Sequence, residues 1–400
     1  MGNRVMNSVP AVEEQQANRT YLVGAFTRET RESAEASLQE MEQLCLSAGL
    51  TVAGRELVRL RTPNPALYLG KGQTERVIET VRELEAPVIV FDQPLSPVQM
   101  RNWARRAQCE IYDRHGVILE IFSRRARTRE AKLQVELARA EYALSHLAGM
   151  WQHLSRQGGG SRLARGEGEK QIEIDRRRLR ERVTRARAAL EKITLQRALR
   201  RDNREGTRKV ALVGYTNAGK SSLLNALANA RLRSADQLFA TLDPVTRRLS
   251  SGPDTTLLLT DTVGFVRNLP PELINAFHST LEEALEADLI LLVLDGSDPE
   301  APVHLETTRH ILNQLGAGEI PVALVLNKLD RTADPGRAEF GLRSLMKDTD
   351  RVFRVSALTG EGIPQLRHEL LEGAGNGAGA ETGAGAEKKA PAPVDHSPPQ

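Results

Sequence analysis

The sequence has very little cysteine and no long hydrophobic run. Its 400 residues include two cysteines, Cys45 and Cys109, which are too few for a disulfide framework or a cysteine-based zinc site. We therefore expect a reducing compartment. No stretch approaches the roughly 18 uncharged residues of a membrane span, and the first residues lack the apolar core of a secretory signal. These absences predict a cytoplasmic protein without a membrane span, and they leave open that part of it associates with a membrane.

Aromatic residues are also scarce, at 4% of the chain, whereas 27% of the residues are charged and 40% are hydrophobic. This composition is ordinary for a soluble globular protein, and a chain of this length can bury two or three separate cores. We expect a monomer with several domains.

The stretch VALVGYTNAGKSS at 210–222 fits the phosphate-loop pattern G-x-x-x-x-G-K-[ST]. Glycines allow a bare backbone to curl around a triphosphate, so that successive N–H groups face the phosphate oxygens. We expect Lys220 to place its charge on the β- and γ-phosphates and the Ser221 hydroxyl to reach Mg²⁺. An apolar run before the loop and helix-forming residues after it predict the strand–loop–helix context that the motif requires.

Further motifs follow apolar runs in an informative order. The sequence D-T-V-G at 261–264 ends one such run, where Asp261 is placed to hold Mg²⁺ and the Gly264 N–H to meet the γ-phosphate. Asn327, Lys328 and Asp330 end another run, and a carboxylate there can accept both N–H groups of the guanine edge, which adenine lacks. Ser356 and Ala357 follow a third run. Each motif alone is weak, but their order predicts a GTP site.

These motifs resemble those of the translation-factor-related GTPases. A switch threonine completes such a set, and we assign it to Thr241, with Thr246 as the alternative. Together with GYTNAGKSS and DTVGFVRNLP, the segment DQLFATLDPVTRR is similar to the HflX family. The resemblance implies direct action of Lys220, Thr241 and Gly264 on the γ-phosphate, and Mg²⁺ held by Ser221, Thr241 and Asp261. The nucleotide is expected to contact Gly214, Tyr215, Thr216, Asn217, Ala218, Gly219, Lys220, Ser221, Ser222, Phe239, Thr241, Asp261, Gly264, Asn327, Lys328, Asp330, Ser356 and Ala357.

Strand-like and helix-like segments alternate near the start of the chain, which predicts a small parallel α/β domain over 20–127. The expected elements are a strand at 21–26, a helix at 31–48, strands at 52–60 and 88–92, and helices at 72–84 and 97–108. Two glycines around Lys71 suggest either a phosphate site or, as we favour, a turn that caps the next helix. The stretches YLGKGQ, LSPVQMRN and YDRHGVILEIF look like parts of the HflX N-terminal domain.

Two seams of apolar residues predict a pair of matching helices over 128–205. The first seam is Leu133, Leu137, Ala140, Leu144, Leu147, Trp151 and Leu154, and the second is Leu179, Val183, Ala186, Leu190 and Ile193. Glycines at 158, 159, 160, 166 and 168 separate them, so we expect an antiparallel hairpin with a flexible tip. A GTPase domain with a mostly parallel sheet should occupy 206–370, between disordered ends at 1–19 and 371–400.

The hairpin region is strongly basic. Over 156–209, 18 Lys and Arg residues stand against 8 Asp and Glu, whereas the whole chain has a net charge of only +3. Such a run is often a solvated helix face, but a one-signed charge without aromatic residues for base stacking favours contact with the phosphates of structured RNA. Arg162, Arg165 and Lys170 are the candidate contacts, although Lys170 stands where threonine is usual in the family's tip signature.

The resemblance to HflX implies a GTP hydrolase that binds the large (50S) ribosomal subunit and its RNA, and that splits or rescues stalled ribosomes. A GTP-gated factor of ribosome assembly without splitting activity is the alternative. A metabolic kinase is a third possibility, but the guanine motif and the lack of an acceptor-substrate site argue against it. Asn217 in the phosphate loop also occupies a position at which some such GTPases hold K⁺, so a simple loop amide and a cation site both stay open.

The assignment of Asp330 to the guanine edge can be tested by Asp330→Asn. The amide can donate a hydrogen bond to the oxygen that replaces the guanine amino group in xanthine. We expect the variant to lose affinity for GTP and to gain affinity for xanthosine triphosphate in a competition titration. A variant that still prefers GTP would contradict the assignment.

Overall fold

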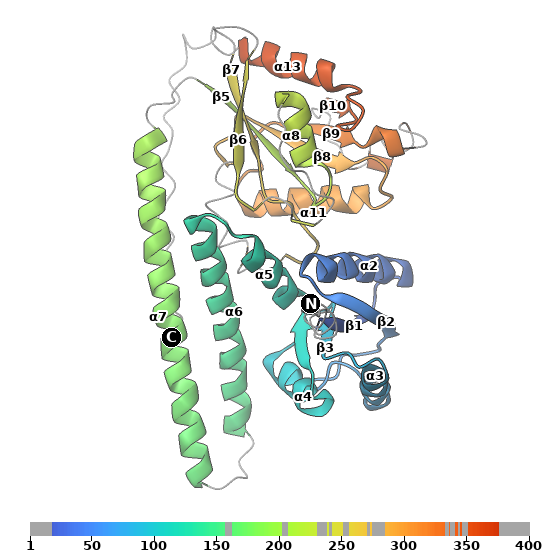
Figure 1. Cartoon of the computed structure of the whole chain (residues 1–400), viewed down its shortest axis with the longest axis vertical. Helices are drawn as coiled ribbons and strands as arrows, with labels where there is room; N and C mark the ends of the chain where they lie inside the picture. Colours follow the sequence, from blue (N-terminus) through green and yellow to red (C-terminus); the bar gives the residue numbers. More distant parts are fainter. Residues whose placement is uncertain are drawn as a thin grey trace, which may run out of the picture.

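In the computed structural model, structure is described for residues 18–156, 162–201, 207–229, 238–239, 242–250, 256–269, 273, 285–332, 336, 341–342, 345 and 351–375. The ends expected to be disordered lie almost wholly outside these residues. Among the helices that are described, none is long and apolar enough to cross a membrane. Figure 1 shows two α/β units, one above the other, with two long helices along one side.

The N-terminal unit is a four-stranded parallel sheet with helices on both faces, as the alternating pattern predicted. The strand order is β2-β1-β3-β4. Because successive residues of a strand face opposite sides of the sheet, Leu22 packs with Leu38 and Met41 of one helix, whereas Tyr21 and Val23 lie in a second cluster on the other face. The elements are β1 Arg19–Phe26, α2 Arg31–Ser47, β2 Thr51–Arg59, α3 Lys71–Glu83, β3 Val88–Phe91, α4 Pro97–Ala107, β4 Glu110–Asp113 and α5 Arg114–Arg125.

The turn before α3 has the capping role that we favoured for the glycines around Lys71. Gly70 is the N-cap of α3, and its backbone N–H donates to the Gln73 side chain at 3.0 Å. The preceding residues form a tight turn in which Asn64 and Tyr68 are bridged backbone to backbone.

The two long helices are α6, Arg129–Arg156, and α7, Arg162–Arg201. Figure 1 shows them side by side as an antiparallel pair. The seam prediction is confirmed for the residues whose burial is described, because Leu137, Ala140 and Ala186 are buried and the other seam positions are half-buried. The hairpin is attached to the N-terminal unit through α6, where the Tyr142 hydroxyl donates to Asp113 Oδ1 at 2.8 Å.

The tip differs from the expectation. Helix α7 already begins at Arg162, so Gly166 and Gly168 lie within it rather than in a connection. Residues 157–161, which include the other three glycines, are outside the described part. A glycine costs a helix interior about 1 kcal/mol. Leucine, alanine, arginine, glutamate and lysine around the two glycines are strong helix formers, and they offset this cost.

The C-terminal unit is a six-stranded sheet of order β10-β9-β8-β5-β7-β6, in which only β6 is antiparallel to its neighbour. The sequence predicts apolar strands at 209–213, 257–260, 289–294, 322–326 and 352–355, and all five form the parallel strands of this sheet. Strand β6, with its alternating half-exposed residues, was not predicted. The elements are β5 Arg208–Gly214, α8 Lys220–Ala228, β6 Val245–Ser250, β7 Thr256–Asp261, β8 Leu289–Asp295, α11 Ala301–Gln314, β9 Val322–Asn327, β10 Arg351–Arg354 and α13 Ile363–Gly375.

The last helix corrects one boundary. We expected the disordered tail to begin at residue 371, but α13 continues to Gly375 and Leu371 is buried against the sheet. A buried leucine adds to the apolar surface removed from water, which holds the last turn of the helix in place.

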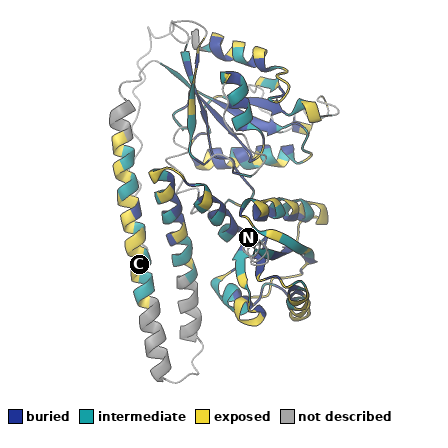
Figure 2. Ribbon diagram, in the orientation of Figure 1, coloured by how far each residue is buried: buried dark blue, intermediate teal, exposed yellow. Residues whose placement is uncertain are grey.

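One hydrophobic cluster extends across both units. It joins Leu38, Met41 and Phe122 of the N-terminal unit to Phe239 and Val266 of the C-terminal unit. The rings of Phe122 and Phe239 lie with their centroids 4.6 Å apart. Figure 2 shows that burial is concentrated on the sheets and on the helix faces turned toward them, whereas α7 is mostly exposed.

Candidate nucleotide-binding site

The phosphate loop lies between the buried strand β5 and helix α8. Its two motif glycines stand where a side chain cannot fit. A Cβ atom on Gly214 would lie 2.2 Å from the Val293 carbonyl oxygen, and one on Gly219 would lie 2.2 Å from Nδ2 of Asn327. Gly219 also has a φ of +92° and is the N-cap of α8. The loop can therefore curl tightly and present backbone N–H groups at the helix N-terminus, which is suited to binding an anion.

Lys220 arches back over this loop. Its Nζ donates to the carbonyl oxygens of Gly214 at 3.1 Å and Tyr215 at 2.8 Å, and the residue is buried. Burial lowers the pKa of Lys220 to about 8, against a smaller opposing effect of the Asp261 carboxylate. A nearby triphosphate would favour the charged form of the lysine.

The residues expected to hold Mg²⁺ meet at the carboxyl ends of two neighbouring strands. Because β5 and β7 are parallel, the first residue of α8 after the lysine lies beside the end of β7, and Ser221 Oγ donates to Asp261 Oδ2 at 2.5 Å. A hydroxyl and a carboxylate in contact form an oxygen donor set of the kind that Mg²⁺ prefers. Thr241 lies outside the described residues, whereas Leu238, Phe239 and residues 242–248 of its segment are described.

The segment 261–269, which we name switch II, is packed directly on the phosphate loop. A Cβ atom on Gly264 would lie 2.8 Å from Thr216 Cα and 2.9 Å from Lys220 Nζ. The next residue pairs with the loop as a strand would: Phe265 N–H donates to the Gly214 carbonyl at 3.1 Å, and Thr216 N–H donates to the Phe265 carbonyl at 2.7 Å. The Phe265 side chain is only 1% exposed, so it cannot orient an attacking water.

The guanine motifs are held together by one buried amide. Asn327 Nδ2 donates to the Ala218 carbonyl at 2.9 Å, and Asn327 Oδ1 accepts from the Ala357 N–H at 3.0 Å. Asp330 accepts a hydrogen bond from Ser356 Oγ at 2.5 Å. The amide thus connects the phosphate loop to the backbone expected at guanine O6, while the serine orients the carboxylate expected at the N1/N2 edge.

Asp295 belongs to this group and was not predicted. Its Oδ2 lies 2.7 Å from Nζ of Lys328, a residue whose φ is +64°. The carboxylate holds the lysine side chain beside the guanine motif. Asp295 is the last residue of the apolar strand β8. The reasoning that singled out Asp261 at the end of β7 could therefore have found Asp295 as well. Ser222 lies in the first turn of α8, half-buried.

Two predicted contact residues turn their side chains away from the loop. The Tyr215 ring stacks on His304 of α11, with centroids 3.6 Å apart, and its hydroxyl donates to Glu40 of α2. Phe239 is buried against Phe122, although its backbone N–H donates to Thr216 Oγ1 at 2.8 Å. Only the backbones of these residues remain near the expected nucleotide.

Two cavities lie near the phosphate loop or between the two units. One of about 580 Å³ is lined by Thr216, Asn217 and Ala218 of the loop together with residues of α2. A larger one of about 1110 Å³ lies between the two units and is lined by Asp92, His115 and His310 among others. The larger cavity contains no phosphate-loop residue, so the geometry of the loop, rather than cavity size, identifies the nucleotide site.

The candidate RNA contacts lie far from the nucleotide. Arg162, Arg165 and Lys170 are in the first turns of α7, at the end of the hairpin that is remote from the phosphate loop in Figure 1. The structure describes their backbone but not their side chains.

Comparison with known proteins identifies the family. Three family profiles match in succession: GTP-binding GTPase N-terminal at 35–123, GTP-binding GTPase Middle Region at 125–204, and 50S ribosome-binding GTPase at 209–328. The GTPase HflX of Akkermansia muciniphila is 46% identical over 347 residues, which cover 84% of this chain and 79% of the relative. The GTPase HflX of Escherichia coli is 43% identical over 347 residues, which cover 86% and 80%.

The chain belongs to the HflX GTPase family. It is accordingly a GTP hydrolase, and the prediction of family, fold class and enzyme type is confirmed. A crystal structure of SsGBP in complex with GDP aligns with a TM-score of 0.51 over 90% of this chain and 99% of that chain, at 24% identity. At this identity the similarity extends to the fold alone.

The lowered pKa of Lys220 predicts how nucleotide affinity of this HflX GTPase depends on pH. Below about pH 8 the amine is protonated with or without nucleotide. Above that pH Lys220 of the free protein loses its proton, whereas Lys220 beside the phosphates of a bound nucleotide retains it, so binding requires proton uptake. Affinity for GDP should fall as pH rises from 7 to about 9, by up to about tenfold per unit beyond the pKa.

Calorimetric titration in two buffers of different ionisation enthalpy measures this uptake directly. The titrations are kept below the pH at which the guanine ring ionises. Constant affinity across the range, with no proton uptake, would contradict the assigned pKa.

Proposed function

We propose that this GTPase binds the large (50S) ribosomal subunit in its GTP-bound form and splits or rescues stalled ribosomes. The observation that carries the proposal is a basic helix face in the same chain as the candidate nucleotide site. The matched family profile is described as a ribosome-binding GTPase, which supports the same partner.

The basic face extends along the described length of α7. Its exposed residues between 173 and 196 include Arg177, Arg178, Arg180, Arg182, Arg185 and Arg187. Arg182 and Arg187 also contact Glu136 and Glu141 of α6. No aromatic residue occurs between 173 and 196, so the face suits the phosphate backbone of RNA better than its bases.

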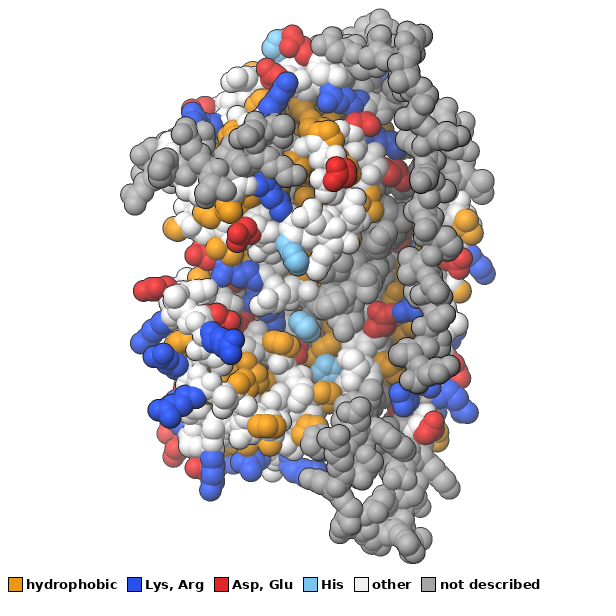
Figure 3. Space-filling view, turned by 180° about the vertical axis from the view of Figure 1, so that it is seen from behind, with side chains coloured by type: hydrophobic (Ala, Val, Ile, Leu, Met, Phe, Trp, Pro, Cys, Tyr) orange, Lys and Arg blue, Asp and Glu red, His pale blue; other side chains and the backbone are white. Residues whose placement is uncertain are grey.

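Basic side chains also cover part of the N-terminal unit. Figure 3 shows Lys and Arg gathered over the lower part of the reverse face, which belongs to that unit. A large RNA surface can contact both regions at once, and such spread-out contacts raise overall affinity without strong individual bonds. We also propose that the protein is a cytoplasmic monomer, as the sequence predicts.

The proposed chemistry is GTP hydrolysis, in which the protein contributes mainly by positioning the phosphates and the metal ion. The loop N–H groups and Lys220 would hold the phosphates, and Ser221, Asp261 and Thr241 would hold Mg²⁺. When bound, the ion neutralises charge that develops on the phosphate oxygens. Because Phe265 cannot orient water, we expect slow hydrolysis by the protein alone and stimulation by groups from outside.

The second candidate, an assembly factor that binds precursor RNA without splitting activity, is favoured by the same basic face. Sedimentation of 70S particles separates the two. With GTP and the protein present, splitting predicts a shift of 70S particles into free subunits, whereas the assembly factor predicts binding without that shift. The experiment includes a nonhydrolysable GTP analogue and GDP, because a splitting factor gated by GTP should act with the first and not with the second.

The hairpin tip can be tested by replacing Arg162 and Arg165 with alanine. For each phosphate that the protein neutralises, the logarithm of the affinity falls by roughly 0.7 to 0.9 for every tenfold rise in salt concentration. We expect the variant to show a shallower salt dependence of 50S binding and less ribosome-stimulated hydrolysis, with its slow intrinsic rate unchanged. Thr241→Ala should instead weaken only the GTP-dependent part of the affinity.

The matched control replaces Arg248 and Arg351 with alanine. These are exposed arginines of the GTPase unit, so the control loses the same charge elsewhere. If the tip variant and the control bind and respond to 50S subunits alike, the tip does not contact RNA.

The cation hypothesis concerns Asn217, which lies in the phosphate loop with a φ of +61°. We propose that its side chain helps to hold K⁺ beside the phosphates, where the ion supplies a positive charge. Turnover should then be faster in K⁺ than in Na⁺ at equal ionic strength, and Asn217→Ala should abolish the difference. Equal rates in the two salts for the unmodified protein would exclude the site.

A further inference from the structure

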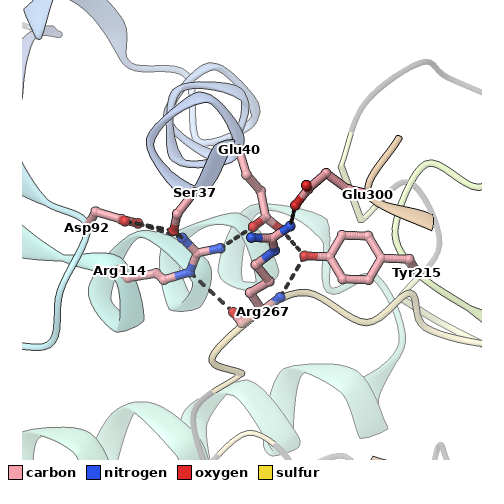
Figure 4. A network of polar contacts seen from close by, with 7 residues as sticks. All are labelled: Ser37, Glu40, Asp92, Arg114, Tyr215, Arg267 and Glu300. Atoms are coloured by element: carbon pink, nitrogen blue, oxygen red, sulfur yellow. Dashed lines mark hydrogen bonds and ion pairs between the residues drawn. The ribbon is translucent and has the colours of Figure 1, made fainter. Parts of the chain in front are cut away.

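A fully buried arginine lies between the N-terminal unit and switch II. Arg114, the first residue of α5, has no exposed side-chain surface. Its Nη1 donates to Asp92 Oδ1 at 2.5 Å, its Nη2 donates to Glu40 Oε2 at 2.6 Å, and its Nε donates to the Arg267 carbonyl oxygen at 3.2 Å. Figure 4 shows the guanidinium at the centre of this group. It therefore binds two carboxylates of its own unit and one backbone oxygen of switch II.

The Arg114 guanidinium carries its charge despite being buried. Burial lowers its pKa, but the carboxylates of Glu40 and Asp92 together raise it above the ordinary value. A buried charge is tolerated only where its donors find partners. One of those partners is the carbonyl of Arg267, so the arrangement is fully satisfied only while switch II stays in place.

A second link reaches the same residue from the phosphate loop. The Tyr215 hydroxyl donates to Glu40 Oε1 and accepts from the Arg267 N–H at 2.8 Å. Both backbone polar groups of Arg267 are thus bound to parts of one network, and its side chain pairs with Glu300 at the start of α11. Figure 4 shows Glu40 between Arg114 and Tyr215.

The polar network is continuous with the apolar contact between the units. Val263 and Val266 of switch II belong to the same cluster as Leu38 and Met41 of α2. Only two residues separate Arg267 from Gly264, whose N–H is the expected partner of the γ-phosphate. A displacement of Gly264 on nucleotide exchange must therefore act on Arg267 and on the face of α2.

We infer that Glu40 and Arg114 clasp switch II, so that the nucleotide-dependent position of switch II and the docking of the N-terminal unit form a single equilibrium. Switch segments of GTPases are ordered or released according to the nucleotide. Here the segment has charged, buried partners in a second unit, and these make the N-terminal unit a sensor of the nucleotide. By linkage, docking of the N-terminal unit must in turn alter the relative affinities for GTP and GDP.

Amide hydrogen exchange of the full-length protein tests the clasp. Exchange is followed in the peptides of α2, Arg31–Ser47, with GDP and with a nonhydrolysable GTP analogue. We expect the two nucleotides to give α2 exchange rates that differ by about fivefold or more, and Glu40→Gln to remove most of that difference. The ratio of affinities for the two nucleotides, measured by displacement of a fluorescent GDP, should change in Glu40→Gln by a comparable factor.

Glu35→Gln is the matched control, because Glu35 lies on the same helix and pairs with Arg55 within the N-terminal unit. It should retain the nucleotide-dependent difference. Tyr215→Phe removes the same link from the opposite side while keeping the ring on His304, and it serves if Glu40→Gln does not fold. The inference is overturned if α2 exchanges alike with both nucleotides in the unmodified protein, or if the difference persists in both Glu40→Gln and Tyr215→Phe.

Discussion

The close packing around two glycines of the phosphate loop is the constraint on which the nucleotide site depends. Gly214 lies against the backbone of β8, and Gly219 lies against the Asn327 amide at the end of β9. Because neither position has room for a Cβ, the ends of three parallel strands can converge within hydrogen-bonding distance. The phosphate, metal and guanine motifs come from separate parts of the chain, and this packing brings them to one edge of the sheet.

Much of this arrangement follows from local pattern. The apolar runs predicted all five parallel strands of the GTPase unit, because a strand buried on both faces needs a continuous apolar stretch. The seams of the hairpin were predicted for the same kind of reason. The order of the motifs then placed Ser221 near Asp261 and Asn327 near Ala357. Thr241, also singled out by its motif, lies outside the described residues.

The parts that could not be predicted depend on contacts between distant segments. Strand β6 is at the sheet edge, where half-exposed residues give only a weak pattern. Nothing local to Glu40 or Arg114 distinguishes these residues from ordinary surface charges, since their partners lie up to 175 positions away in the chain. The pattern also did not show that the Tyr215 side chain leaves the loop, because loop spacing fixes backbone position but not side-chain direction.

The length of α7 has a mechanical consequence. At 1.5 Å per residue, its 40 residues extend for roughly 60 Å. The first half of α6 holds the hairpin: it packs on α4 and α5, Tyr142 donates to Asp113, and just before the helix Thr128 donates to Asp243, two positions after Thr241. The tip lies at the far end of α6, whose 28 residues extend for roughly 42 Å. A rotation of about five degrees at the start of α6 would displace the tip by roughly 4 Å. The hairpin would then act as a lever arm that turns a small rearrangement beside the nucleotide into a displacement of several ångströms at the tip.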